Sequence, residues 1–159
     1  GQLVVAQGRK RLYWEFANRN LSGVTGITGT GVTVSDPVVD DLARKAILAT
    51  DPSPQGLFSV DLTYDHAGVP NPTEINIGRL FTTHEFFTRA GLNIPDLYLR
   101  CALGEPLPNI PVRVNPLPPG LAWVRGMDSR PVLTTVDAIQ HRRDDLAARR
   151  KALGGPPAP

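Results

Sequence analysis

The sequence predicts an α+β fold in which a central, mostly antiparallel sheet is flanked by helices. Strand-like segments at 57–64 and 73–77 lie close enough along the chain to form a hairpin, whereas apolar residues at helical spacing occupy a separate segment at 36–49. The chain of 159 residues is 41% hydrophobic, which is sufficient for a core. We therefore expect a lobe over residues 1–131, followed over 132–159 by a polar basic helix and a disordered Gly/Pro tail.

The amino-terminal segment predicts a first hairpin. Residues 3–6 are a short apolar run, residues 7–10 have the composition of a turn, and residues 12–16 are rich in aromatic side chains that favour strands. The next segment, residues 20–35, carries four glycines among threonines, which is too much backbone freedom for a helix. We expect a loop there that closes into a strand near residues 31–34.

The middle of the chain predicts three helices and the hairpin. Ser35 or Asp36 followed by Pro37 is typical of a helix start, so the first helix is expected over 36–49. Two more helices are expected against the sheet, at 84–90 and 95–103. Beyond them the prolines of residues 105–119 predict an extended connection. The last expected elements are a strand pair at 112–114 and 121–126 and a polar helix over 137–153.

Charge and cysteine content exclude several classes of partner. The net charge is +2, but residues 141–151 hold five basic and two acidic groups, or +3, so the rest of the chain is near −1. Because the basic character belongs to one segment, we expect no nucleic-acid partner for the fold. No run of 18 apolar residues and no signal-peptide pattern occur, so we expect no membrane partner. The single cysteine, Cys101, excludes an internal disulfide and indicates a reducing, cytoplasmic location.

The hairpin carries the residues with the clearest chemistry. If residues 65–70 connect the strands, Asp61 lies directly opposite Glu74, and Asn76 shares their face. Two opposed carboxylates within a largely apolar hairpin repel, so a cation is expected between them. Carboxylate and amide oxygens suit a hard divalent cation such as Mg²⁺. Arg79 follows at the end of the second strand, and its guanidinium suits a phosphate or a carboxylate.

Other interpretations of these residues stay open. The acidic side chains could form an ordinary solvated hairpin face, or a general acid–base pair as in glycosidases, although no aromatic sugar platform accompanies them. Arg79 could instead cap a helix or pair with Glu85. The loop that contains Ser22 and Gly23 could cradle a phosphate with its backbone or be an ordinary loop.

The spacing of these residues resembles a known family signature. The set Asp61, Glu74 and Asn76 reads D-x12-E-x-N and is similar to the metal-binding signature of the ATP-grasp enzymes. The stretch PTEINIGRLFTTHEFFTRAGLNIPDLYLRCALGEPLP resembles the carboxy-terminal catalytic lobe of that fold, most of all in the carbamoyl-phosphate-synthetase-like branch. The resemblance covers residues 20–104 and extends weakly to residue 131.

The resemblance implies an ATP- and Mg²⁺-dependent carboxylate ligase that forms an acyl phosphate, which an amine or another nucleophile then attacks. Asp61 and Glu74 would hold Mg²⁺, or Mn²⁺ in its place, with Asn76 completing the metal site. Arg79 would be catalytic by steadying the acyl phosphate. The candidate residues for binding the ATP cofactor come from the strand and loop expected to face the cleft, namely Arg11, Asn20, Ser22 and Gly23.

The resemblance also implies that this lobe acts with something more. The family fold is longer than this chain, and its nucleotide-clamping lobe would precede Gly1. The expected partners are a small-molecule carboxylate and an amine or other nucleophile, together with a missing amino-terminal lobe or further copies in a homo-oligomer. The alternative function is a non-catalytic, ATP-grasp-derived interaction module.

Overall fold

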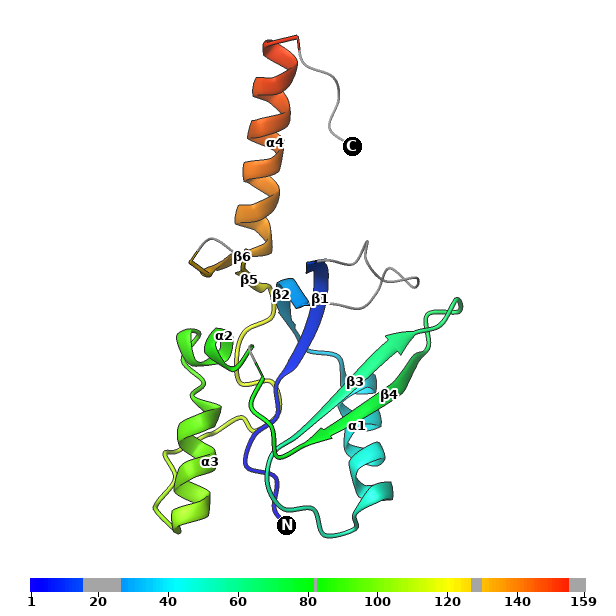
Figure 1. Ribbon diagram of the computed structural model, residues 1–159, viewed down its shortest axis with the longest axis vertical. Coiled ribbons are helices and arrows are strands. Elements are labelled where there is room, and N and C mark those ends of the chain that lie inside the picture. Colours follow the sequence, from blue (N-terminus) through cyan, green and yellow to red (C-terminus); the bar gives the residue numbers. More distant parts are fainter. Residues whose placement is uncertain (16–26, 82, 127–129, 155–159) are drawn as a thin grey trace. The chain divides into compact units, whose positions relative to one another are not determined.

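The computed structural model describes residues 1–15, 27–81, 83–126 and 130–154 (Figure 1). These residues form two compact units, the first made of Gly1–Gly8 and Val34–Pro118 and the second of Arg9–Thr33 and Pro119–Pro159. The predicted α+β class with antiparallel strands and flanking helices is confirmed. The prediction of one central sheet is wrong, because the described strands form a four-stranded and a two-stranded sheet. The domain boundary placed at residue 131 stays a prediction.

The first unit contains the two-stranded sheet and three helices. In chain order its elements are α1 (Pro37–Thr50), β3 (Phe58–Tyr64), β4 (Pro70–Ile77), α2 (His84–Arg89) and α3 (Ile94–Leu103). Helix α1 begins as its sequence predicts, since the Asp36 carboxylate accepts hydrogen bonds from the backbone N–H groups of Val38 (3.0 Å) and Val39 (3.4 Å). The three predicted helices are thus present, with ends that differ by a residue or so.

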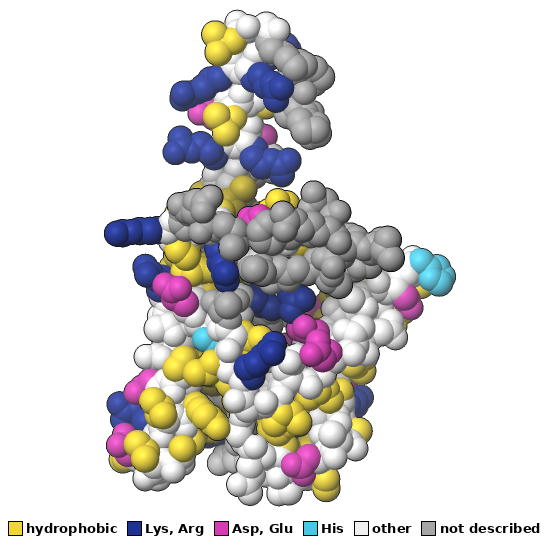
Figure 2. Space-filling model, viewed as in Figure 1, with side chains coloured by type: hydrophobic (Ala, Val, Ile, Leu, Met, Phe, Trp, Pro, Cys, Tyr) yellow, Lys and Arg dark blue, Asp and Glu magenta, His cyan; other side chains and the backbone are white. Residues whose placement is uncertain are grey.

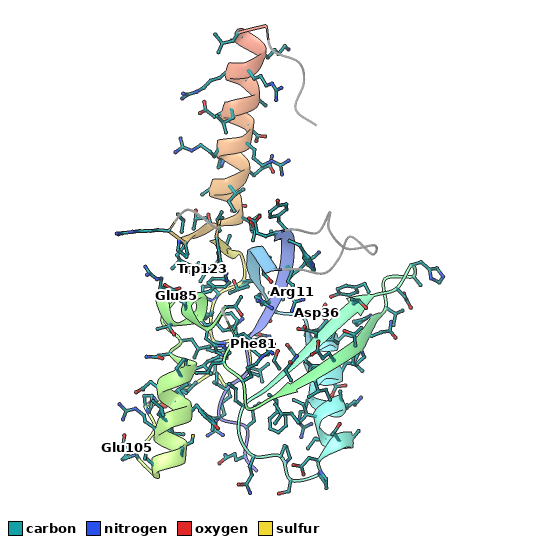
Figure 3. The ribbon with its side chains drawn as sticks, in the orientation of Figure 1. Arg11, Asp36, Phe81, Glu85, Glu105 and Trp123 are labelled. Carbon is teal, nitrogen blue, oxygen red and sulfur yellow. The ribbon has the colours of Figure 1, made fainter. Side chains whose placement is uncertain are left out.

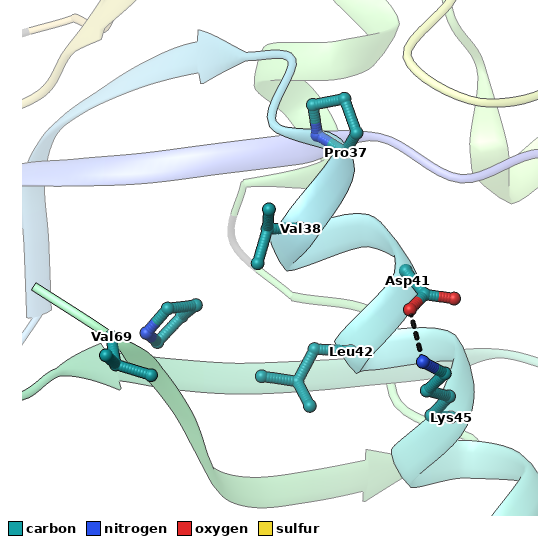
Figure 4. Close-up of a pocket in the computed structure, with 7 residues that line it drawn as sticks. Pro37, Val38, Asp41, Leu42, Lys45 and Val69 are labelled. Carbon is teal, nitrogen blue, oxygen red and sulfur yellow. Dashed lines mark ion pairs between the residues drawn. The ribbon is translucent and has the colours of Figure 1, made fainter.

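One face of the β3–β4 hairpin lies toward α1. The Tyr64 hydroxyl donates a hydrogen bond to Asp36 Oδ2 over 3.3 Å, which ties the end of β3 to the start of α1. Val69 and Pro70 at the tip of the hairpin line an open groove of about 480 Å³ together with residues of α1 (Figure 4). Because successive strand residues alternate in direction, the face that carries Asp61 is the other one.

Helices α2 and α3 bring the buried side chains of this unit together. Phe86 is fully buried, and its ring centroid lies 5.3 Å from that of Phe87. Leu92 and Leu97 are buried as well. Glycines follow both helices: Gly91 and Gly104 have φ angles of 103° and 69°, which a side chain would strain.

The predicted hairpin at residues 3–16 and the predicted pairing of 112–114 with 121–126 are both wrong. Ala6 instead forms a parallel bridge with Val114. Asn115 secures this arrangement: its Oδ1 accepts a hydrogen bond from the Gly8 N–H over 2.7 Å, and its Nδ2 donates to Asp40 Oδ2 over 2.6 Å. With a φ of 53°, Asn115 adopts the left-handed conformation that asparagine tolerates, and no local pattern signals this long-range clamp.

The second unit contains the four-stranded sheet, in the order β1–β2–β5–β6, and one helix. Its elements are β1 (Gly8–Glu15), β2 (Ile27–Val34), β5 (Leu121–Val124), β6 (Val132–Thr135) and α4 (Val136–Ala152). Antiparallel pairing sets Val32 opposite Ala122, and Trp123 opposite Leu133. Trp123, Ala122 and Val32 are buried and form the core of this sheet.

Strands β1 and β6 show where the sequence misleads. Gly8 lies in the predicted turn yet begins β1, because a side chain there would approach the Val34 carbonyl oxygen to 3.0 Å and glycine avoids that contact. Strand β6 was not predicted, since no turn residue separates it from α4. Thr135 ends the strand and also caps the helix, its Oγ1 accepting from the Ala138 N–H over 3.1 Å.

Candidate functional site

The β3–β4 hairpin places the two predicted carboxylates opposite each other. Asp61 pairs with Glu74, and two residues along the strands Ser59 pairs with Asn76. Directly opposed residues of an antiparallel pair share a face, with Cβ atoms about 4.5–5.5 Å apart. The structure therefore brings Asp61, Glu74 and Asn76 together on one face, which is the arrangement expected from the sequence.

The connection between the strands differs from the prediction. Tyr64 pairs with Pro70 and Thr63 with Asn71, so the connecting loop is one residue shorter than expected. An irregularity between Asp61 and Leu62 adds one residue to β4 and restores the Asp61–Glu74 pair. Thr73 is the added residue, and its hydroxyl donates to the Asp61 carbonyl over 3.1 Å. Pro72 gave a signal for this bulge, because proline inside a strand favours edges and bulges.

The polar face of the hairpin is more open than its sequence suggests. Asp61 and Asn76 are half-buried, but Glu74 is exposed, which corrects the expectation that both carboxylates sit among buried residues. An exposed carboxylate keeps most of its hydration and can exchange it for a bound cation. The Glu74 carboxylate is therefore open to a ligand from solution.

Arg79 is placed by the backbone that follows β4. The Gly78 N–H donates to the Leu57 carbonyl over 2.8 Å, and Gly78 has a φ of 69°, so the chain turns sharply at the end of the strand. The Arg79 side chain is exposed, and its guanidinium carbon lies 5.0 Å from the centroid of the Phe81 ring. Glu85, one alternative partner for Arg79, pairs instead with Arg89 at 2.9 Å.

The other predicted site residues belong to different parts of the chain. Arg11, labelled in Figure 3, lies on β1 in the second unit, with its guanidinium carbon 5.4 Å from the centroid of the Trp14 ring. Asn20, Ser22 and Gly23 lie outside the described residues. Of the predicted site residues, Asp61, Glu74, Asn76 and Arg79 thus belong to the same unit.

The donor set of the hairpin fits a hard cation that keeps other ligands. Among the residues that the structure describes, no three His, Cys, Asp or Glu side chains form a group that could hold a metal ion. The hairpin supplies two carboxylates and one amide, so Mg²⁺ bound there would take its remaining oxygens from water and from phosphate. This is the usual way in which proteins bind Mg²⁺ at phosphate-transfer sites.

Titratable side chains from α1 and β3 gather near the start of α1. Burial raises the pKa of Asp40, and the nearby Asp36 charge raises it further, while the hydrogen bond from Asn115 opposes both. Burial also raises the pKa of the Tyr64 hydroxyl, as does Asp36. Asp36 already caps α1, so we assign this cluster to the anchoring of the helix and the hairpin.

Comparison of the chain with family models, curated proteins and solved structures gave no match. Within the described residues, no helix combines the length and the apolar character needed to cross a membrane.

Proposed function

We propose that the chain carries the metal-binding part of an ATP- and Mg²⁺-dependent carboxylate ligase of the ATP-grasp type, most similar to the carbamoyl-phosphate-synthetase-like branch. One observation carries the proposal: Asp61 lies directly opposite Glu74 with Asn76 on the same face, the donor set of that family's signature. The coarse α+β architecture is compatible with it.

In this function the hairpin binds and orients nucleotide phosphates. Asp61 and Glu74 would hold Mg²⁺ with Asn76, and the ion would neutralise charge on the phosphates. A carboxylate oxygen of the substrate attacks the γ-phosphorus, the bond from that phosphorus to the ADP oxygen breaks, and an acyl phosphate forms. An amine or another nucleophile then displaces phosphate from the acyl carbon. Arg79, exposed beside the hairpin, would steady the negatively charged acyl phosphate.

The test is thermal unfolding of the protein, with any preceding lobe included, in the presence of Mg²⁺ and a non-hydrolysable ATP analogue. We expect a rise in melting temperature that needs both components, because a ligand that binds only the folded state stabilises it. Glu74→Gln should remove the shift, whereas Glu85→Gln, an equal change on α2, should keep it. An identical shift in wild type and Glu74→Gln would contradict the proposal.

An assay for the acyl-phosphate intermediate distinguishes the ligase from the alternative, a non-catalytic interaction module. Hydroxylamine traps acyl phosphates as hydroxamates, so a panel of carboxylates with ATP and Mg²⁺ reports the first step directly. The ligase predicts hydroxamate that depends on Glu74, measured in the protein with any preceding lobe included. If ADP and hydroxamate never form there although the fold is intact, the interaction module is the better account.

A further inference from the structure

Helix α4 carries an apolar ridge between two rows of arginines. Ile139 and Leu146 are spaced by seven residues, or about two helical turns, so their side chains lie nearly in line, and Leu153, seven residues further on, is the C-cap residue directly after the helix. Residues three and four positions after Ile139 and Leu146 flank the ridge on either side. These flanking positions are all arginine: Arg142 and Arg149 on one side, Arg143 and Arg150 on the other.

The opposite side of α4 has a mixed composition. At about 100° per residue, Asp137 and Asp144 lie across the helix from the ridge, with Lys151 and Ala148 near them. Charges of both signs therefore occupy the opposite side, whereas the two rows that flank the ridge are positive alone. Figure 2 shows this arrangement on α4, where hydrophobic side chains run along the middle of the visible face with Lys and Arg side chains to both sides.

Two of the three ridge residues are largely open to solvent, whereas Ile139 is half-buried. Leu146 is 58% exposed and Leu153 is 87% exposed, so the arginine stems do not cover them. Arg149 pairs with Asp145 at 3.1 Å. Among the described residues no ion pair is formed by the other three flanking arginines, Arg142, Arg143 and Arg150. This side of α4 thus combines exposed apolar side chains with arginines that form no ion pair within the described residues.

We infer that this face docks an acidic amphipathic helix of a partner protein. Such a helix would lay its own apolar ridge along Ile139, Leu146 and Leu153 and place glutamate or aspartate against the two arginine rows, as flanking charges do in coiled coils. Charge complementarity at the flanks selects the partner and its orientation. The docking does not depend on nucleotide or metal.

Other occupants fit the face less well. A second copy of α4 would oppose arginine to arginine: when two helices run antiparallel with Leu146 against Leu146, Arg142 meets Arg150 and Arg143 meets Arg149. A membrane-surface helix needs a broader apolar face with bulky side chains than this single ridge provides. Nucleic-acid binding would use the arginines but leaves the exposed leucines without a role.

The experiment measures binding of a fluorescein-labelled acidic peptide to the 159-residue chain by fluorescence anisotropy at low salt. The peptide is a helix of about 21 residues with leucine every seventh position and glutamate at the flanks. We expect Arg150→Glu to weaken binding about tenfold or more, because it sets like charges against each other. Lys151→Glu changes the charge equally one residue away but on the other face, and should change the affinity less than about twofold.

A second pair of variants tests the ridge. Leu146→Gln should weaken binding about tenfold through lost apolar burial, and Ala148→Gln on the far face should not. A control peptide with glutamine in place of leucine should bind weakly to the wild-type chain. Circular dichroism checks that each variant keeps its helix content.

Three results would overturn the inference. Equal weakening by Arg150→Glu and Lys151→Glu, or equal binding of the leucine and glutamine peptides, would show diffuse charge attraction in place of docking. Capture of the chain by phosphatidylserine vesicles or duplex DNA, through the same arginines and without binding of the acidic peptide, would assign the face to another class of ligand. A dimer lost on Leu146→Gln would assign it to a second copy.

Discussion

The two sheets of the molecule use their side chains in different ways. The four-stranded sheet of the second unit buries Trp123, Ala122 and Val32 to 6% exposure or less. The β3–β4 hairpin of the first unit packs one face toward α1 and turns a polar face, with Asp61 and the exposed Glu74, to other contacts. One sheet is a core, whereas the other displays oxygen donors.

This difference predicts that folding stability and ligand binding depend on different residues. Side chains in the four-stranded sheet should decide whether its unit folds, and the polar residues of the hairpin should contribute little to folding and much to ligand binding. The following substitutions test whether folding stability and ligand binding depend on different residues.

The largest loss of stability is expected for Trp123→Ala. The indole is 1% exposed, and removal of such a side chain leaves a cavity that costs about 3–5 kcal/mol. The matched control is Leu133→Ala on the paired strand, 37% exposed, which should cost about 1 kcal/mol. Urea unfolding monitored by circular dichroism measures both. Equal losses would show that the four-stranded sheet is not organised around Trp123.

Gly78→Ala should have an intermediate effect. A Cβ there meets no atom within 4 Å, but the φ of 69° strains any side chain, at a cost of about 1–2 kcal/mol. The same substitution moves Arg79 relative to the hairpin, so ligand binding should fall as well. Gly68→Ala at the hairpin turn, with a φ of 77° and equally open space, is the control for strain alone. Equal loss of nucleotide binding in both variants would argue against a positioning role for Gly78.

Glu74→Gln should change the free energy of unfolding by no more than about 0.5 kcal/mol, because the side chain is exposed. Loss of nucleotide-dependent stabilisation with an unchanged urea midpoint would show that Glu74 serves ligand binding and not folding. A large loss of intrinsic stability would instead make Glu74 a structural residue and remove the contrast between the two sheets.

The smallest effect concerns pH. Since burial holds the pKa of Asp40 above its ordinary value of 3.8, the folded chain binds this proton more tightly than the unfolded chain. The resulting stabilisation is full below that ordinary value and is lost as the pH rises through the raised pKa. Relative to Asp40→Asn, the wild type should therefore lose a small amount of stability between acidic and neutral pH, because solvent screens most of the effect on this partly exposed carboxyl. Urea midpoints measured across this range would contradict the account if the wild type gained stability instead.

Local patterns predicted the elements better than their partners. Asp36 and Pro37 start α1 as predicted, because caps depend on neighbouring residues alone. The bridge between Ala6 and Val114 depends on Asn115, whose partners Gly8 and Asp40 lie far away in the sequence.

The candidate site shows the same limit. The Asp61–Glu74 pair is present as predicted, although a shorter loop and the bulge at Thr73 together produce the pair that a longer loop alone was expected to give. The alternation of side chains along a strand and the length of the turn determine which residues share a face. Pro72 alone indicates a bulge, and it does not specify where the extra residue lies. The openness of Glu74 depends on what packs near the hairpin, which no local pattern contains.

The central claim is that the opposed carboxylates bind a divalent cation, and paramagnetic broadening by Mn²⁺ tests it most directly. Amide signals of the ¹⁵N-labelled chain would be followed during titration with substoichiometric Mn²⁺, in wild type and in Asp61→Asn/Glu74→Gln. We predict that signals of β3 and β4 around Asp61 and Glu74 broaden first, and that the double variant loses this effect. Broadening that is strongest near other carboxylates, or unchanged in the double variant, would contradict the claim.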